Sequence, residues 1–238
     1  MIRTGCSLAL LASAWIGSAA WAQTLSNQSL SGKYFFRQVS LGTPPYPASL
    51  NGITVLIDNV AAPIYFAGPS GSQFQINCLV PYATSGAAAT IVVQSGSASS
   101  NTVTVPVAAT SPGVYSLTSN GCGTGAILHA DYTEVTTAKP AQASETVLIY
   151  LTGLGAVTPA VADGTAAGSD PLSFTVNAPL VYVGDEQAQV IYSGMAPGFP
   201  GLYQINVTLP PYFPSTGDLP LAISTANAYS DQVYIPIH

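Results

Sequence analysis

Apolar and polar residues alternate over many short segments of the chain, which is the pattern of β-strands that bury one face. The strongest segment is TVLIYLT at residues 146–152, and clusters of Gly, Pro, Ser and Asn separate such segments from one another. Runs of Ala, Leu, Glu and Lys at helical spacing are missing. The pattern therefore predicts an all-β protein of many short strands joined by turns.

One eight-residue phrase occurs twice, as FQINCLVP at residues 74–81 and as YQINVTLP at residues 203–210. Because successive side chains of a strand point to opposite faces, the apolar members of each phrase share one face. The polar members then share the other face: Gln75, Asn77, Gln204 and Asn206. We expect each phrase to be a strand that its proline ends, since proline has no N–H to donate to a neighbouring strand.

The repetition extends to both sides of the phrase. The parallel segments are residues 53–66 with 179–193, where Tyr65 aligns with Tyr192, and residues 86–107 with 217–237. The offset between the copies grows along the chain, so the insertions fall in loops, as a shared strand framework predicts. We interpret the chain as an internal repeat of one β-rich unit.

The residues between the two copies occur once and add strands to the second half. With them, the second half has about seven strands, close to the roughly 100-residue immunoglobulin-type sandwich. The first half has one further credible strand, at residues 33–41, which leaves open whether its sandwich is complete. The fold class that we predict is all-β, with two tandem Ig-like β-sandwich domains at residues 23–108 and 109–238.

Several segments in a fixed order carry a resemblance to a known family. They include VLIDNVAAPIYF, FQINCLVPY, GTGAILHADY, KPAQASETVLIYLTGLGAVTP and SDQVYIPI, within residues 51–238. The chain resembles the uncharacterised C-terminal domain family of secreted acidobacterial proteins (Solibacter-type), whose halves are similar to Ig-like IPT/TIG β-sandwich domains. The resemblance implies a secreted or surface-associated β-sandwich module without an established activity, and it brings no catalytic residues to transfer.

The first 22 residues have the features of a secretory signal peptide. Arg3 precedes a short apolar run, and Ala20-Trp21-Ala22 forms an A-x-A cleavage site. The apolar run is too short to span a bilayer, which takes about 20 residues. We predict a secreted or cell-surface protein after cleavage near Ala22, with no membrane insertion of the mature chain.

Charged residues make up only 6% of the chain, and the formal net charge is −6. Beyond the predicted signal peptide the only cationic side chains are Lys33, Arg37 and Lys139. Nucleic-acid binding needs several Lys or Arg contacts to phosphates, so a nucleic-acid partner is excluded. The partner that we expect is an extracellular protein or glycan.

Two cysteines follow the predicted signal peptide, Cys78 and Cys122. An extracellular compartment permits disulfides, so they either form one bridge or are two buried thiols that act as small hydrophobic residues. Spacing in the sequence does not decide between these alternatives, because a disulfide depends on how the two Cβ atoms face each other.

The sequence offers little to support catalysis. His129 and Asp131 could touch on one face of a strand, but a His/Asp pair beside a turn is the simpler interpretation. Most acidic residues lie beside turn-forming residues, although Asp163 and Asp170 could contribute to a calcium site. The glycine-rich segments NGCGTGA and TGLGAV indicate tight turns or bulges rather than phosphate-binding loops. We predict no catalytic residues, no metal site and no cofactor.

Aromatic residues give the best candidate for ligand binding. Five of them surround the loop at residues 195–202 in the sequence: Tyr192, Phe199, Tyr203, Tyr212 and Phe213. Such a loop could stack on sugars or dock a partner chain, and the alternative is that the rings cover the hydrophobic core. The repeated Gln and Asn residues likewise form either a polar ligand face or hydrogen bonds to the backbone.

Three functional hypotheses follow from these observations. The leading one is a secreted non-enzymatic Ig-like module for adhesion, spacing or presentation at the cell surface. The second is a carbohydrate- or peptide-binding module that uses the aromatic loop of the second domain. The third, an esterase- or glycosidase-like enzyme, is disfavoured because histidines are scarce and acidic residues are scattered.

Overall fold

The computed structural model describes residues 44–70, 73–118 and 121–238 of the chain. Every regular element in these residues is a β-strand, which confirms the predicted all-β class. Helices that could cross a membrane are therefore not found in this part of the chain. The predicted signal peptide, and the predicted strand at residues 33–41 with Lys33 and Arg37, lie outside the described residues.

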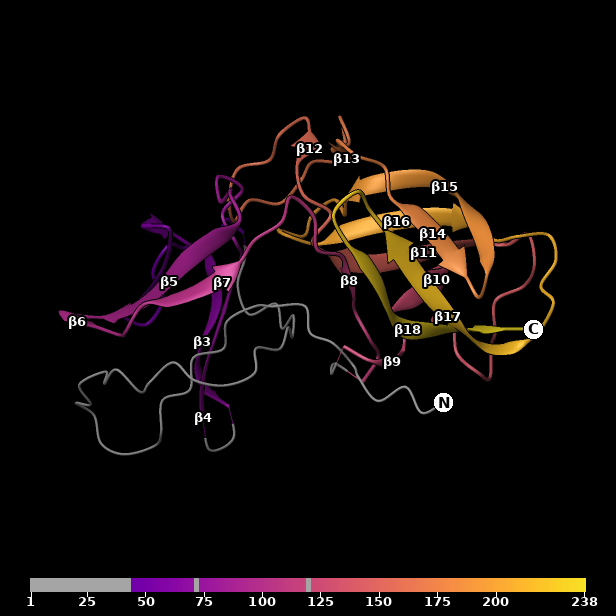
Figure 1. Cartoon of the computed structure of the whole chain (residues 1–238), viewed down its shortest axis with the longest axis horizontal. Coiled ribbons are helices and arrows are strands. Elements are labelled where there is room, and N and C mark those ends of the chain that lie inside the picture. The colour runs from indigo at the N-terminus through magenta and orange to yellow at the C-terminus, as the bar shows by residue number, and fades with distance from the viewer. Residues whose placement is uncertain (1–43, 71–72, 119–120) are drawn as a thin grey trace. The chain divides into compact units, whose positions relative to one another are not determined.

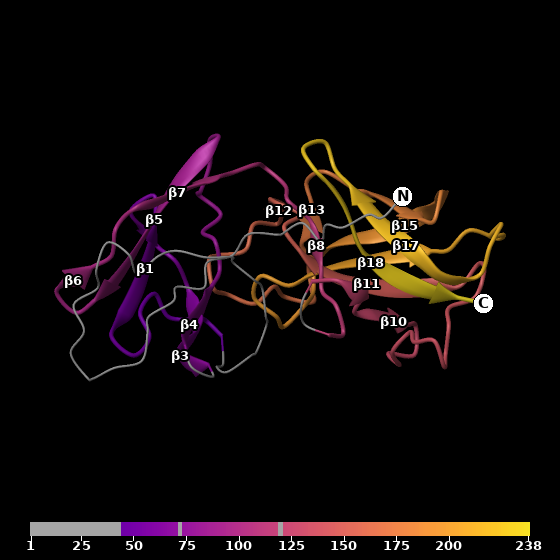
Figure 2. The ribbon, with the colours of Figure 1, turned by 60° about the horizontal axis from the view of Figure 1, so that its bottom comes forward.

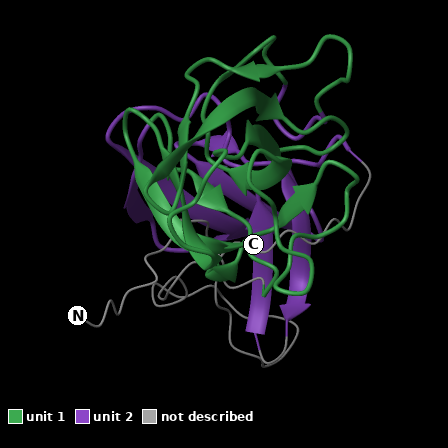
Figure 3. Ribbon diagram, turned by 90° about the vertical axis from the view of Figure 1, so that its right-hand side faces the viewer, with its two compact units in different colours: residues 1–9, 109–161, 167–238 green, residues 10–108, 162–166 purple. Residues whose placement is uncertain are grey.

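The chain forms two compact units, which are coloured separately in Figure 3. Unit 1 contains Ala109–Val161 and Ala167–His238, apart from residues 119–120. Unit 2 contains the described residues up to Ala108, together with the short segment Ala162–Ala166. The sequence pattern gave no indication that a segment of the second half packs with the first half. That each unit is a separate Ig-like domain stays a prediction.

Unit 2 has seven strands in two sheets (Figure 1). The strands are β1 (Ile53–Ile57), β2 (Val60–Ala61), β3 (Ile64–Ser70), β4 (Gln73–Cys78), β5 (Ala88–Ser95), β6 (Ala98–Ser99) and β7 (Val103–Pro106). One sheet has the order β2-β1-β5-β6, with β7 also pairing with β5, and the other is the β3–β4 hairpin. Both sheets contribute buried residues to one hydrophobic core, including Val55, Ile64, Ile76 and Val93.

Unit 1 has eleven strands joined in one curled sheet (Figure 1). The strands are β8 (Gly113–Val114), β9 (Gly123–Thr124), β10 (Ile127–His129), β11 (Thr146–Thr152), β12 (Val157–Thr158), β13 (Phe174–Thr175), β14 (Leu180–Val183), β15 (Glu186–Met195), β16 (Tyr203–Thr208), β17 (Gly217–Ser224) and β18 (Tyr229–Ile237). The main order is β10-β11-β16-β15-β14-β17-β18-β9, and Figure 2 shows the long β17–β18 hairpin in yellow.

The long strand β15 connects the two parts of this curled sheet. Its first residues pair with β14, and from Gln189 onward it pairs with β16. A bulge between Val190 and Tyr192 follows shortly after this change of partner, and an extra residue of this kind bends and twists a strand. Because one continuous sheet curls around the core, the finer expectation of tandem Ig-like sandwiches stays a prediction.

Strands β11 and β16 show why this sequence folds as a sheet with two different faces. Val147, Ile149 and Leu151 alternate along β11 and are completely buried in the core of unit 1. Ile205 and Val207 do the same along β16. Burying each such side chain stabilises the fold by about 1.5–3 kcal/mol. The intervening residues of both strands point away from the core and form an outer face.

Candidate functional site

The repeated amides of the second half meet on the outer face of unit 1. Gln204 and Asn206 project from β16 on the side opposite Ile205, and the Gln204 Nε2 donates a hydrogen bond to the Asn206 Oδ1 at 2.7 Å. Both side chains are half-buried. Within the described residues this bond leaves the Gln204 Oε1 as an acceptor and the Asn206 Nδ2 as a donor. The pair can therefore offer both N–H donors of the Asn206 Nδ2 and the Gln204 Oε1 acceptor to a ligand.

A tyrosine ring lies beside this amide pair. Tyr192 is the partner of Asn206 across the β15–β16 ladder, and Gly194 is the partner of Gln204. A Cβ atom added to Gly194 would stand 2.6 Å from the Tyr192 Oη and 2.9 Å from its Cζ. The ring therefore lies across Gly194, and the Tyr192 Oη donates a hydrogen bond to the Met195 carbonyl oxygen at 2.7 Å. Burial raises the pKa of this hydroxyl, which stays protonated and keeps its donor role.

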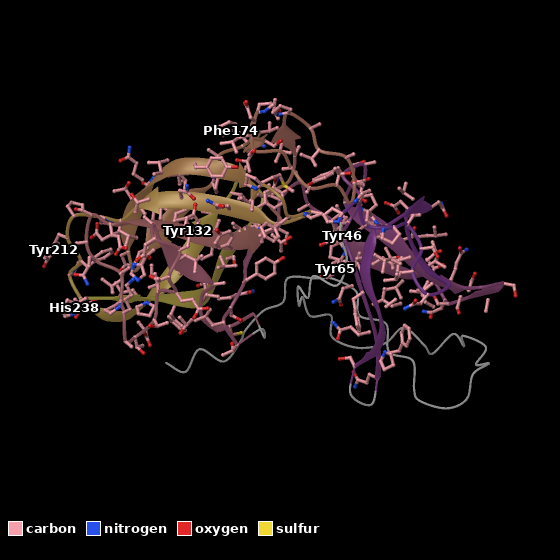
Figure 4. The ribbon with its side chains drawn as sticks, turned by 180° about the vertical axis from the view of Figure 1, so that it is seen from behind. Tyr46, Tyr65, Tyr132, Phe174, Tyr212 and His238 are labelled. Atoms are coloured by element: carbon pink, nitrogen blue, oxygen red, sulfur yellow. The ribbon has the colours of Figure 1, made fainter. Side chains whose placement is uncertain are left out.

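Phe174 extends the aromatic surface beyond the edge of β15. It pairs with Gly194 from strand β13, and its ring contacts the Tyr192 ring edge-on, with 5.4 Å between the centroids and 63° between the planes. Half of the Phe174 side chain is exposed, and the residue is labelled in Figure 4. The Phe174 ring is positioned by its contact with Tyr192 and by the pairing of its strand with Gly194, and its exposed half can contact an apolar face of a ligand.

Strand β11 supplies a second aromatic border on the other side of the amides. Tyr150 is the partner of Gln204, and Leu148 is the partner of Asn206. Leu148 is buried although it does not belong to the core cluster, so neighbours on the outer face cover it. Burial, together with the nearby hydroxyl of Tyr132, raises the pKa of Tyr150. Tyr132 itself is 70% exposed (Figure 4).

We call this surface the amide–aromatic face. It consists of Leu148 and Tyr150 on β11, Gln204 and Asn206 on β16, Tyr192 and Gly194 on β15, and Phe174 on β13. The sequence predicted that the two amides would share the face opposite the core, and the structure confirms this. The sequence did not predict that Phe174 belongs to this face, because its strand β13 has only two residues. Leu148 and Tyr150 did carry a signal, because the run TVLIYLT is apolar on both faces.

Unit 2 contains the same contacts around its own copy of the phrase. The Gln75 Nε2 donates to the Asn77 Oδ1 at 2.7 Å, the length found in unit 1. Phe66 faces Asn77 and Gly68 faces Gln75 across the β3–β4 ladder. The Phe66 Cζ lies 3.4 Å from where a Cβ of Gly68 would stand, so this ring also lies over a glycine.

The shared contacts correct one predicted alignment. A bulge between Ile64 and Phe66 in β3 corresponds to the bulge between Val190 and Tyr192 in β15. Phe66, and not Tyr65, is therefore the counterpart of Tyr192. Tyr65 is the extra residue of its bulge and is buried, and burial raises its pKa well above the ordinary range.

The structure does not bring the five predicted aromatic residues together. Tyr203 is only 4% exposed and belongs to the core, with its hydroxyl donating to the Gly155 carbonyl oxygen, and Phe213 is 8% exposed in the same core. Phe199 and Tyr212 are exposed, but Phe199 precedes β16 and Tyr212 follows it. A strand of six residues is roughly 20 Å long, which keeps these two rings apart. Only Tyr192 lies on the amide–aromatic face.

The contact between His129 and Asp131 that the sequence allowed, but did not favour, does not form. The His129 Nδ1 lies 2.5 Å from the Glu145 Oε1, and its Nε2 lies 3.2 Å from the Lys139 carbonyl oxygen. Asp131 turns instead to Thr133 and Lys139, and hydrogen bonds from the Thr133 hydroxyl and N–H and from the Lys139 Nζ hold its pKa well below the ordinary range. Both nitrogens of His129 are engaged in structural contacts, and the ring is buried.

The alternative bridge between Cys78 and Cys122 does not form either, because Cys78 is a free thiol. It is completely enclosed in the core of unit 2, beside Ile64 and Ile76. Burial raises the pKa of Cys78 to about 12. The Cys78 thiol therefore acts as a small hydrophobic residue, as the second alternative had it for both cysteines, whereas Cys122 is disulfide-bonded.

The buried thiol should make the stability of the protein sensitive to alkaline pH. Its folded pKa is raised, so its contribution is fully present below the unfolded pKa, about 8.5, and is lost as pH rises toward about 12. Between about pH 9 and about pH 10, we expect the wild type to lose about 1 kcal/mol more free energy of unfolding than Cys78→Val. Urea unfolding at both pH values measures this. If the free energy of unfolding falls equally with pH in the two proteins, the prediction is wrong. Valine is a suitable replacement, because Val207 occupies the equivalent position in the second phrase.

Acidic residues do not gather into a cation site in the described residues. No group of three or more His, Cys, Asp or Glu side chains there is close enough to hold a metal ion. Asp163 lies in unit 2, where its Oδ1 accepts a hydrogen bond from the Tyr82 N–H at 2.9 Å, whereas Asp170 lies in unit 1. The two residues considered for calcium are thus assigned to different units.

The fold and the site define a class of protein: an all-β chain of two units with a partly exposed face of rings and amides. No family model matches the chain, and no curated protein matches it. The resemblance to the Solibacter-type family therefore assigns no family to it.

Among solved structures, the chain has a weak similarity to the surface layer protein SbsC, in the structure of its domains 4–9. The two are 12% identical, the match covers 90% of this chain and 24% of that chain, and the TM-score is 0.24. The chain thus spans about a quarter of the structure that it matches. A likeness at this TM-score supports no conclusion on fold or function.

Proposed function

We propose that the chain is a secreted, non-enzymatic module of two Ig-like units that binds an extracellular ligand and serves adhesion or presentation at the cell surface. The A-x-A site after a short apolar run supports the signal peptide and the location. The equivalent amide bonds and glycine-supported rings in unit 1 and unit 2 support an origin by internal repetition.

The observation that carries this function is the amide–aromatic face of unit 1. Phe174 is half exposed, Tyr192 lies over Gly194 beside it, and the nearby amides keep both donors and acceptors for a ligand. Binding surfaces combine such apolar contacts with a few well-placed polar groups. In unit 2 the equivalent Asn77 is only 7% exposed, and we therefore assign binding to unit 1.

The aromatic loop of the second domain is the alternative binding surface. Phe199 carries this alternative, because it is exposed in the turn between β15 and β16. Tyr203 and Phe213 do not support it, since both are buried in the core. The amide–aromatic face offers more contacts than a single exposed ring, so it is the surface that we favour.

Binding of the mature chain, residues 23–238, to immobilised neutral glycans, anionic glycans and peptides tests the proposed function. We expect saturable binding to one class and at least about tenfold weaker binding for Phe174→Ala, since a ring contact contributes about 1 kcal/mol beyond its buried area. Phe199→Ala and Tyr212→Ala are matched controls that remove exposed rings elsewhere and should bind as the wild type does. Loss of binding in Phe199→Ala alone would favour the loop, and no saturable binding to any class would contradict the proposal.

A further inference from the structure

We infer that the amide–aromatic face binds a neutral saccharide chain, an inference that rests on the proposed function. The first argument is charge. The side chains that form the face are uncharged: Leu148, Tyr150, Phe174, Tyr192, Gln204 and Asn206. Lys139 is the single cationic side chain in the described part of the sequence, and its Nζ is bound to Asp131 at 3.1 Å. Anionic sugars and phosphorylated ligands would therefore find no cation on this face.

The pairing of the central strand argues against an extended peptide. Strand β16 pairs with β15 on one side and with β11 on the other, so its backbone N–H and C=O groups are used within the sheet. Peptides that bind as an added strand need a free sheet edge, because main-chain hydrogen bonds supply their affinity. The face offers only side chains to a ligand, namely rings and amides.

A pyranose chain has the chemistry that fits these side chains. Sugar rings present apolar C–H faces that stack on aromatic rings, and their hydroxyl groups both donate and accept hydrogen bonds. The Gln204 Oε1 accepts and the Asn206 Nδ2 donates, so the pair suits hydroxyl groups in either role. Rings border the amides on both neighbouring strands, and β15 and β11 lie about 10 Å apart across β16. This spacing suits a chain of several sugars rather than a single one.

The face is already organised before any ligand arrives. The Tyr192 ring is fixed by Gly194 beneath it and by the bond of its hydroxyl to Met195, and the Gln204 and Asn206 side chains hold each other. Ordering a long side chain on binding costs about 0.5–1.5 kcal/mol, and this cost is largely removed here. Such organisation favours recognition of a weakly interacting neutral ligand.

Calorimetric titration of the mature chain with cellohexaose and chitohexaose as neutral chains, oligogalacturonate as an anionic chain and a neutral Gly/Ser/Tyr peptide tests the inference. We expect binding of at least one neutral saccharide alone. Phe174→Ala should weaken it about tenfold or more, and so should Asn206→Asp, which replaces the free Nδ2 donor with a carboxylate of the same shape. Tyr212→Ala should bind as the wild type does. Two-dimensional amide spectra check that each variant keeps the fold, and Phe174, being half exposed, can be replaced without loss of core packing.

Each other outcome overturns a defined part of the argument. If only the peptide or the anionic chain binds, and Phe174→Ala abolishes that binding, the saccharide inference fails while the proposed function stands. If a neutral saccharide binds and neither variant weakens it, the face is not the site. If none of the probes binds, and the glycan and peptide surfaces also give no signal, both the inference and the proposed function fail.

Discussion

Replacing Gly153 with alanine should lower the free energy of unfolding of unit 1 by about 4 kcal/mol. Gly153 has a φ of +80°, and a Cβ atom there would stand 1.9 Å from the Ser111 carbonyl oxygen. A left-handed backbone costs a residue with a Cβ about 1–2 kcal/mol, and overpacking against a fixed backbone adds about 1–3 kcal/mol. The overlap also threatens the bond from the Ser111 N–H to the Gly153 carbonyl oxygen at 2.8 Å, which is worth about 1 kcal/mol.

A second glycine separates the effect of the overlap from the effect of the backbone angle. Gly198 has a φ of +84°, but a Cβ atom there would meet nothing within 4 Å. Gly198→Ala should therefore cost only about 1 kcal/mol. Amide hydrogen exchange at Ile149 and Ile205 measures the free energy of unfolding of unit 1 in both variants, since these two residues lie in its core. If both variants lose the same free energy of unfolding, the overlap of the added Cβ with Ser111 does not contribute to the loss in Gly153→Ala.

The two glycines of TGLGAV show what the sequence could and could not predict. Their interpretation as turn glycines holds, because Gly153 and Gly155 both have positive φ. The need for glycine comes from residues about 40 positions earlier, since a Cβ at Gly155 would stand 2.4 Å from the Ala109 carbonyl oxygen. Close approach of two backbones distant in sequence leaves no local pattern that periodicity could detect.

The five aromatic residues do not form one cluster for a related reason, and Tyr203 and Phe213 instead cover the core, which was the alternative for these rings. Alternation along YQINVTLP already places Tyr203 on the core face with Ile205, and the structure confirms that direction. Proximity in the sequence was the wrong guide for Phe199 and Tyr212, because β16 separates them along its whole length. The amides, by contrast, were predicted correctly to share a face, since the two-residue period of a strand is a local property. Their aromatic neighbours come from other strands, so predicting them would have required knowledge of which strands pair.

Replacing Glu145 with alanine should have the second largest effect, a loss of about 2–3 kcal/mol in the free energy of unfolding. The His129 and Glu145 side chains are 7% and 23% exposed, and Glu145 also accepts a hydrogen bond from the Gln142 N–H through its Oε2 at 2.9 Å. Both ring nitrogens of His129 face acceptors, the carboxylate and the Lys139 carbonyl oxygen. Without the carboxylate, a buried ring nitrogen and a backbone N–H lose their partner, and each such loss costs about 1–3 kcal/mol before solvent compensates for the exposed part.

The other acid–base pair of this loop provides the matched control. Lys139 and Asp131 form an ion pair at 3.1 Å, but their side chains are 52% and 61% exposed. Water and salt screen such a pair, so Lys139→Met should leave the midpoint of thermal unfolding unchanged. Glu145→Ala should lower that midpoint clearly, and added salt should not restore it, because His129 is buried. Equal midpoints for Glu145→Ala and Lys139→Met would mean that the His129–Glu145 contact is as weak as a surface pair. A clear difference would establish His129 as a structural residue, bound on both sides, which disfavours the histidine as a general base.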